Sequence, residues 1–457
     1  MSTRLPKGIP FIVANEAAER FSFYGLRSIL ATFLIAHFYN PTGNQTLQAQ
    51  AEAQANHDTH LFTSLIYFIP FFGGLLADWF WGKYRTILWL SIVYAIGCFC
   101  LAAFTTYRVL FLLGLLLIAI GSGGIKPCVA AHVGDQFVPA NKHLMERAFS
   151  LFYLSINVGS LLSTLLIPWV YRNHGPALAF GIPGLFMAIA TLIFFLGRNR
   201  YLRLPPTGTG KSNFLSVSFH ALFHGWQHAR EHYGASIVQH VRKAWRFLGF
   251  LAFMPLFWAM LGQSYSEWVL QATKLDLEFL GVRWLPEQIQ SLNPMLILIL
   301  IPLLSFGIMP ALQKRGVVLS PQRRVGWGFV LVIAAFLVIW SLQRALDSGA
   351  QPSIGWQMLA YALLTFGEVL VYNAGMEYAY AQAPTSMKST IMSCFILTAA
   401  LGNYLVAAIN GNMASGGFFA RFTGADYFLL FIVLMAASTV LFLWRYARPA
   451  APAAPRT

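Results

Sequence analysis

The chain has 457 residues, of which 57% are hydrophobic and only 10% charged, and its formal net charge is +15. A soluble domain carries about 25% charged residues, so this composition excludes an ordinary soluble domain, and its hydrophobicity excludes a disordered chain. Four cysteines in apolar stretches form no paired framework, which excludes a disulfide-stabilised module. Apolar runs of about 20 residues, long enough to cross a bilayer as helices, recur along the chain. We expect a polytopic membrane protein.

Apolar runs between charged or turn-rich breaks predict twelve membrane-spanning helices. The first run has no small-residue cleavage site after it, so we expect a retained helix rather than a signal peptide. The expected spans cover residues 11–38, 60–79, 86–105, 107–130, 148–171, 177–197, 246–266, 288–313, 325–345, 355–382, 386–413 and 425–447.

The longest break, residues 198–245, divides the expected spans six and six. After Pro205 and Pro206 its apolar residues recur at helical spacing, in a stretch too short and too polar to span. We therefore expect a cytoplasmic linker with an amphipathic helix at 198–245, between an N-terminal six-helix bundle at 1–197 and a C-terminal one at 246–457. Two such bundles are typical of transporters that alternate access to a midplane site.

The positive charge is distributed unevenly along the chain. With the N-terminus inside, most of the 31 lysines and arginines fall in or beside the inside segments. This asymmetry predicts that both termini are cytoplasmic. The basic balance therefore indicates topology and contact with membrane lipid, and we expect no nucleic-acid partner.

Two motifs in the linker resemble signatures of soluble enzymes. Residues 209–212 match the last part of a phosphate-binding loop motif. However, Pro205 occupies the position of the motif's first glycine, and no strand precedes it. We therefore expect no nucleotide binding. Histidines that recur every four residues could bind a metal, but we interpret them as the polar edge of the interfacial helix; they are His220, His224, His228 and His232. We expect no metal, no cofactor and no enzyme activity.

The first span carries an unusual set of ionisable residues: Glu16, Glu19, Arg20, Tyr24 and Arg27. At 3.6 residues per turn, Arg20, Tyr24 and Arg27 share one face, with Glu16 beside them. A charge at the bilayer centre costs at least ~2.5–3.5 kcal/mol on insertion scales, so this face must meet a polar interior. An i, i+4 pair of Glu16 with Arg20 could serve packing alone, but Arg27 adds a cation beyond that need.

Further charges lie in later spans. Lys126 follows a run of small residues that allows close helix approach, and it precedes Pro127. Glu368 is the only carboxylate that we expect deep in the second half. Arg20, Arg27 and Lys126 would thus face Glu368 across a central cavity, and opposite charges on two walls suit a zwitterion such as a short peptide.

Several stretches carry a family resemblance. EAAERFSFYG at 16–25 resembles the ExxERFxYY signature of the proton-dependent oligopeptide transporter (POT) family, and FYLSINVGSL at 152–161 is similar to its second signature, FYxxINxGSL. Shorter stretches at 123–128, 134–137, 290–294 and 382–389 resemble the same family, and those at 74–78 and 82–83 resemble the loop motif of the wider major facilitator superfamily.

The resemblance implies an all-α membrane protein with the major facilitator fold, and a symporter that imports di- and tripeptides with protons by alternating access. Because the large outer domain of animal members is absent, it implies a prokaryotic inner (plasma) membrane. Transport of another small solute on the same fold, nitrate or an organic anion, remains an alternative.

The resemblance also implies roles for single residues. Proton coupling would involve Glu16, Glu19, Arg20, His60 and Lys126. His60 lies near the start of its span and could instead be a solvated loop residue, and Tyr67 and Tyr153 could be interfacial anchors. The peptide would contact Arg20, Tyr24, Arg27, Tyr67, Lys126, Tyr153, Asn157, Trp258, Asn293 and Glu368.

Three positions depart from the family pattern. Gly262 stands four residues after Trp258, where the family commonly has an acid. Glu267 further along is a candidate substitute for this acid, but we expect it to lie outside the membrane. Tyr372 replaces a frequent serine, and Phe395 replaces the usual tryptophan of the eleventh span. These departures predict a changed coupling route and a narrower pocket.

Overall fold

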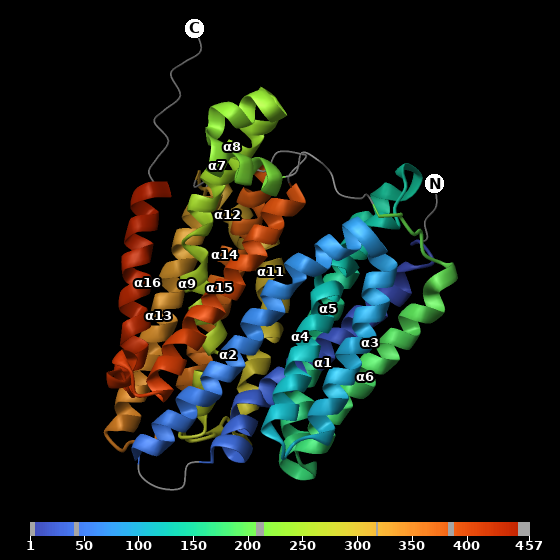
Figure 1. Cartoon of the computed structure of the whole chain (residues 1–457). Helices are drawn as coiled ribbons and strands as arrows, with labels where there is room; N and C mark the ends of the chain where they lie inside the picture. Colours follow the sequence, from blue (N-terminus) through green and yellow to red (C-terminus); the bar gives the residue numbers. More distant parts are fainter. Residues whose placement is uncertain (1–4, 41–44, 207–213, 317–318, 383–387, 447–457) are drawn as a thin grey trace.

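The computed structural model describes residues 5–40, 45–206, 214–316, 319–382 and 388–446, and these form an almost entirely helical molecule (Figure 1). By length and composition, 11 helices could cross a membrane, or 12 if one bent pair is a single span. The prediction of an all-α membrane protein is confirmed. Residues 209–212 and 383–387, which belong to two of the motifs above, lie outside the described residues.

Six long helices form the first half of the molecule. Their core contains large side chains that are fully buried, such as Phe33, Phe111 and Phe180. π-Helical turns at Ile35–Tyr39 and Ala77–Trp81 extend the first two helices. The helices are α1 (Ile9–Leu34), α2 (Gln45–Leu76), α3 (Lys83–Ala103), α4 (Arg108–Asp135), α5 (Met145–His174) and α6 (Pro176–Leu196), with 3₁₀ turns at Pro139–Leu144 and Gly197–Asn199.

The second half contains more breaks. Its buried core is a separate cluster that includes Phe257, Phe329 and Phe336. Its helices are α7 (Phe214–Tyr233), α8 (Ala235–Leu251), α9 (Met254–Gln263), α10 (Glu267–Ala272), α11 (Leu292–Pro302), α12 (Met309–Lys314), α13 (Pro321–Asp347), α14 (Ile354–Gln382), α15 (Lys388–Ala414) and α16 (Ala425–Tyr446). Shorter elements are the hairpin of β1 (Glu278–Phe279) and β2 (Val282–Arg283), 3₁₀ turns at Pro286–Ser291 and Phe418–Arg421, and a π-helical turn at Leu303–Ile308.

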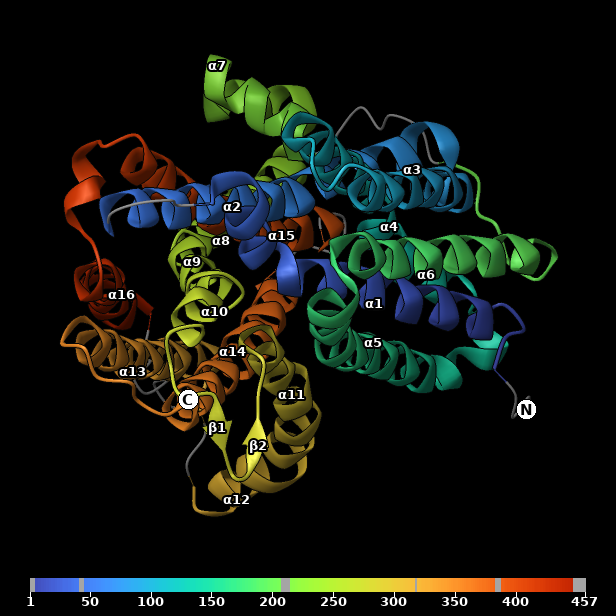
Figure 2. The same ribbon diagram turned by 90° about the horizontal axis from the view of Figure 1, so that it is seen from below.

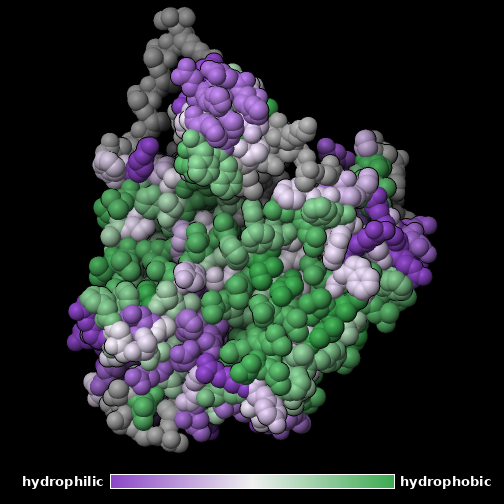
Figure 3. Space-filling model, in the orientation of Figure 1, coloured by the Kyte–Doolittle hydropathy of each residue, from purple (hydrophilic) through white to green (hydrophobic). Residues whose placement is uncertain are grey.

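The two ends of the molecule differ. Helix α1 begins and α16 ends at one end, which we call the terminal end, and the β1–β2 hairpin lies at the other, the hairpin end (Figure 1). Apolar side chains cover the middle of the face in Figure 3, and hydrophilic ones gather toward both ends. An apolar band between two hydrophilic ends is typical of a protein that spans a membrane.

The structure corrects three expected boundaries. Helix α2 begins at Gln45 rather than near residue 60, because its polar first turns pack through buried alanines such as Ala53 and Ala55. The helix that contains the start of the expected span at 246–266 begins earlier, since α8 starts at Ala235. The expected span at 246–266 is broken: α8 bends by 42° into the following pair α9 and α10, where Pro255 in the first turn of α9 has no amide hydrogen to donate.

The halves meet along α2 and α15, which pack side by side (Figures 1 and 2). Within each half, small residues allow helices to approach one another closely. A Cβ at Gly402 of α15 would lie 2.2 Å from the carbonyl oxygen of Pro255, and one at Gly159 of α5 would lie 2.5 Å from that of Ala17. The second contact presses α5 against the charged segment of α1.

Candidate functional site

Arg20 on α1 lies between two buried carboxylates. Its Nε is 2.7 Å from Glu16 Oε1 and 2.9 Å from Glu19 Oε2, and the Glu16 and Glu19 residues are only 2% and 0% exposed. Glu16 is one turn before Arg20, so the helix itself brings the first pair together. The expected Glu16–Arg20 pair is confirmed, and it forms part of a cluster with two acids.

Lys126 on α4 completes the charges of this cluster. Its Nζ lies 4.2 Å from the centroid of the Tyr67 ring and 4.5 Å from that of the Phe23 ring. This nitrogen is buried, and none of the residues that the structure describes forms a hydrogen bond with it. Glu16 and Glu19 act on it electrostatically. A buried ammonium held only by ring faces and distant carboxylates is available to a ligand that brings its own oxygen atoms.

Arg27 extends from α1 to the other half of the molecule. Its guanidinium carbon lies 3.8 Å from the centroid of the Tyr265 ring, just before α10, and its Nε is buried without a hydrogen-bond partner. The acid expected to face Arg27 is absent at Gly262, and Tyr265 supplies a ring face in its place. Among the described residues, no carboxylate forms an ion pair with Arg27, and its buried Nε remains without an acceptor.

Glu368 on α14 is the acid on the opposite wall. Its Oε2 accepts a hydrogen bond of 2.6 Å from Asn293 Nδ2 on α11, and the same amide lies 3.2 Å from the Thr365 hydroxyl. Arg27 of the first half acts electrostatically on Glu368. Asn293 and Glu368, both expected to contact the peptide, are thus hydrogen-bonded to each other across two helices.

Aromatic rings line the space beside Glu368. Trp258 on α9 packs edge-on against Tyr372 and Phe395, at centroid distances of 6.2 and 6.3 Å. Tyr24 and Tyr153 interact electrostatically with Glu368 from the first half. Tyr372 and Phe395, two of the three departures from the family pattern, therefore belong to one ring cluster with Trp258.

Asn157 lies in the same helix as Tyr153. It is 4% exposed, and its Nδ2 donates 3.0 Å to the Tyr153 carbonyl, so it caps its own helix turn. Of the expected residues, Arg27 and Glu368 thus interact across the halves, whereas Asn157 bonds to the backbone of its own helix.

His60 and Glu267 require a correction. Glu267 was expected outside the membrane, but it is buried and its Oε2 lies 3.3 Å from His60 Nε2. The same geometry excludes a solvated loop position for His60, which is 1% exposed. The short helix α10 carries Glu267 back into the border between the halves, which hydropathy alone did not show.

Further polar contacts join the halves toward the hairpin end. Arg172 Nη2 donates 2.9 Å to Glu287 Oε1, and Lys274 Nζ donates 2.9 Å to Glu52 Oε1. Gln290 donates to the Ser28 carbonyl at 3.0 Å. These contacts hold the halves together on the side of the site that faces the hairpin.

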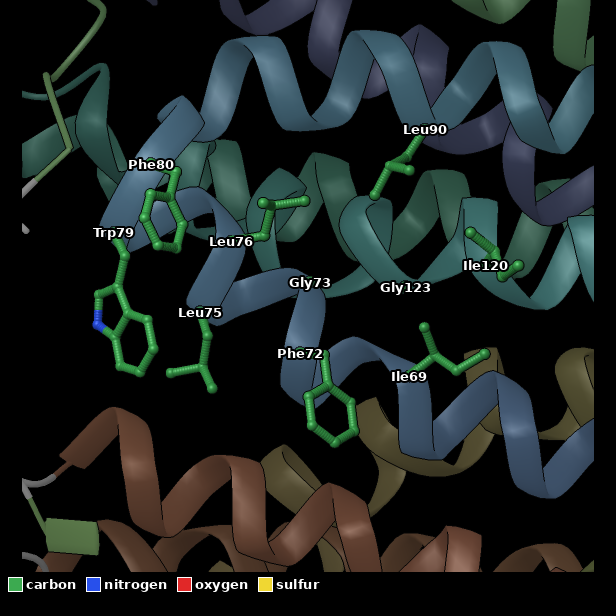
Figure 4. Close-up of a pocket in the computed structure, with 10 residues that line it drawn as sticks. All are labelled: Ile69, Phe72, Gly73, Leu75, Leu76, Trp79, Phe80, Leu90, Ile120 and Gly123. Carbon is green, nitrogen blue, oxygen red and sulfur yellow. The ribbon is translucent and has the colours of Figure 1, made fainter. Parts of the chain in front are cut away.

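An apolar groove of about 410 Å³ lies beside the charged site, on α2 (Figure 4). Its lining contains no ionisable side chain. It extends from Ile69 on α2 to Phe80 in the π-helical turn that follows, with Leu90, Ile120 and Gly123 opposite. The groove therefore offers no partner for a charged ligand and is separate from the candidate site.

The linker histidines adopt a stacked arrangement. Gly225, at φ 85°, bends α7, so that the ring of His220 stacks on those of His224, His228 and His232 at centroid distances of 4.7, 5.3 and 5.0 Å. In the part of the chain that the structure describes, no group of three or more His, Cys, Asp or Glu could hold a metal ion.

Comparison with known proteins gives the family. A family model described as "POT family" matches residues 84–240 and 227–420. The chain belongs to this family. Solute carrier family 15 member 2 of Homo sapiens is 35% identical over 404 residues, 81% of this chain and 54% of that protein, and peptide transporter family 1 of Drosophila melanogaster is 36% identical over 376 residues, 76% and 48%. This POT chain spans about half the length of these curated relatives.

Solved structures agree with this assignment. A crystal structure of an auto-inhibited POT family peptide transporter is 35% identical and covers 99% of both chains with a TM-score of 0.89. The POT family transporter PepTSo is 34% identical, covers 98% of this chain and 99% of its own, and has a TM-score of 0.87. The major facilitator fold expected from the sequence is confirmed, and the relatives are transporters rather than enzymes.

Proposed function

We propose that this POT chain is a proton-coupled symporter that imports di- and tripeptides by alternating access. The observation that carries the proposal is the opposition of charges across the border between the halves. Lys126 and Arg27 lie in the first half, and each has a buried donor that no group of the described residues accepts. Glu368 lies in the second half.

A short peptide matches both walls. Its carboxylate would accept hydrogen bonds from Arg27 and Lys126, with Arg20 close behind them, and charge-assisted bonds of this kind are among the strongest available to a protein. Its ammonium has three donors and would reach Glu368, the carbonyl oxygen of Asn293 and Asn157. Tyr24, Tyr67, Tyr153 and Trp258 would surround its side chains.

Proton coupling follows from the charge balance of the α1 cluster. Glu16 and Glu19 together balance Arg20 and Lys126 while both acids are ionised. A proton on either acid leaves one cation unbalanced, and an unbalanced buried charge is costly. The carboxylate of a peptide restores the balance, so proton and peptide favour each other's binding. Release of the proton returns the cations to their acids.

The halves would rock about this site. Binding of the proton and the peptide favours the state that is closed on one side, and their release favours its reopening. A ligand shifts such an equilibrium only by the difference between its affinities for the two states. We place both termini in the cytoplasm of a prokaryotic inner membrane, because lysines and arginines favour the inside. The hairpin end then faces outside. No observation specifically favours nitrate or an organic anion.

Substrate competition tests this proposal. Purified protein in liposomes should take up labelled dialanine, and excess unlabelled di- and tripeptides should suppress the uptake. Free alanine and nitrate should have little effect, since neither spans both walls of the site. Suppression by nitrate with no effect of peptides would contradict the proposal.

A further inference from the structure

Tyr372 is the member of the ring cluster that stays open to the border between the halves. It is 40% exposed, whereas Phe395 behind it is 1% exposed. Tyr372 interacts electrostatically with Tyr67 and Arg20 of the first half. It also interacts with Glu368 on its own helix. Its phenol therefore lies between the halves, beside the acid that we assign to the ammonium of the peptide.

The other two rings of the cluster hold Tyr372 in place. Its centroid lies 6.2 Å from that of Trp258 and 5.9 Å from that of Phe395, with interplanar angles of 82° and 65°. Aromatic pairs prefer such edge-to-face arrangements. Because each of the three rings contacts the other two, Tyr372 cannot turn toward α9 or α15 without displacing a neighbouring ring.

The rings behind Tyr372 have little room to retreat. A Cβ at Gly375 of α14 would lie 2.9 Å from Phe395 Cε2, so Phe395 is packed tightly against the backbone of that helix. A Cβ at Gly402 of α15 would lie 2.9 Å from the Cβ of Trp258. Close-packed side chains yield little space to an added group. A ligand must therefore fit in front of Tyr372 as the ring stands.

The covalent structure of a peptide determines which of its side chains meets Tyr372. The ammonium and the first side chain are attached to the same Cα, so an ammonium at Glu368 places that side chain within two bonds of the bound nitrogen. Tyr372 follows Glu368 by four residues on α14, and side chains at this spacing are neighbours. The second side chain belongs to the next Cα, about 3.8 Å away, toward Arg27 and Lys126. The first side chain is thus the one beside the phenol.

We propose that Tyr372 is a specificity-determining residue, which restricts the peptide to a small side chain at its first residue and leaves the second residue free to be large. The inference rests on the proposed function, because it uses the orientation of the peptide between Glu368 and the cations. A large first side chain would overlap the ring of Tyr372 or draw the ammonium away from Glu368. Either change costs binding free energy that a small side chain does not lose. The preferred substrates are therefore peptides that begin with a residue such as glycine, alanine or serine.

Two isomeric dipeptides test this restriction in full-length protein in liposomes with an inward proton gradient. Alanyl-phenylalanine and phenylalanyl-alanine have the same composition and charge, and they differ only in which residue carries the large ring. Both compete unlabelled against labelled dialanine. Alanyl-phenylalanine should halve the uptake at a concentration at least about tenfold lower than phenylalanyl-alanine, the discrimination that a filled pocket gives against added bulk.

Substitutions of Tyr372 separate its ring from its hydroxyl. Tyr372→Ser should reduce the ratio between the two isomers to less than about threefold, because the crowding phenol is gone. The reduction should come from stronger competition by phenylalanyl-alanine, with little change for alanyl-phenylalanine. Tyr372→Phe keeps the ring and should keep the wild-type ratio. Tyr372→Ala should behave like Tyr372→Ser, so a folding defect in one of them does not decide the result.

Tyr404→Ser is the matched control. It makes the same chemical change in the second half, at a tyrosine of α15 that is 58% exposed and lies outside the ring cluster. Its ratio between the isomers should equal that of the wild type. Uptake of labelled dialanine by each variant shows that the variant is folded.

The outcomes are distinguishable. Equal competition by the two isomers in the wild type would overturn the restriction alone, and so would an unchanged ratio in Tyr372→Ser and Tyr372→Ala. The same reduction in Tyr372→Phe or Tyr404→Ser would also overturn it, since the ring of Tyr372 would then not be the cause. Failure of the wild type to take up dialanine would overturn the proposed function itself, and the restriction with it.

Discussion

Glu368→Gln is the sharpest test of how the site recognises an amino group. The substitution keeps an oxygen that can accept from Asn293 Nδ2, now 2.6 Å from Oε2, so the shape of the site is retained while the charge is lost. A hydrogen bond to a charged group contributes about 1.5–3 kcal/mol. The KM for dialanine should therefore rise roughly 10- to 150-fold.

The assay compares dialanine with N-acetyl-dialanine in both proteins. The blocked peptide has no ammonium, so Glu368→Gln should change its KM by less than about threefold, within the usual effect of a neutral hydrogen bond. Glu377→Gln is the matched control on the same helix, because Glu377 is exposed and pairs with Arg324. Equal losses for the free and the blocked peptide would refute the assigned role of Glu368.

Three further substitutions test separate parts of the account. Lys126→Ala should abolish gradient-driven accumulation, because the acids of the α1 cluster lose one of their two cations; unchanged accumulation would remove Lys126 from the mechanism. Gly262→Asp should lower the free energy of unfolding by about 1–3 kcal/mol through overpacking, because a Cβ at this position would lie 2.7 Å from Asn403 Oδ1; an unchanged thermal unfolding curve would contradict that. Tyr265→Leu should weaken peptide affinity by about 0.5–2 kcal/mol, because Arg27 loses its ring face; Tyr265→Phe keeps the ring, so equal binding by both variants would exclude this contact.

Much of the site could be predicted because its residues are rare in a membrane. A carboxylate or cation at membrane depth needs a partner, so Glu16, Arg20, Lys126 and Glu368 were visible from hydropathy alone. The i, i+4 spacing of Glu16 and Arg20 also predicted their contact. Which residues face one another between halves depends on packing, and for this the family resemblance was needed.

Glu267 shows where the sequence was insufficient. A hydropathy window ends the span before it, because Ser264, Ser266 and Glu267 together are polar. In the structure a short break and a second helix keep the chain buried, and partners far along the sequence, such as Asn410 and Tyr427, satisfy the acid. The one indication in the sequence was Gly262, where the family commonly has an acid. Its absence there suggested that an acid elsewhere takes its place.

The boundaries of the helices failed for a related reason. The first turns of α2 contain glutamine, asparagine and histidine, and their mean hydropathy is that of a loop. They are helical because they pack between the halves, where Asn56 and Thr59 are buried. Tertiary packing supplies most of the stability of such a segment, and a local window does not contain it.

The most direct test of the central claim is accumulation of labelled dialanine in proteoliposomes with and without an inward proton gradient. The account predicts that the internal concentration exceeds the external one only when the gradient is present, by up to about tenfold per pH unit for each coupled proton. Uptake that reaches the same level with and without the gradient would contradict proton-coupled peptide symport.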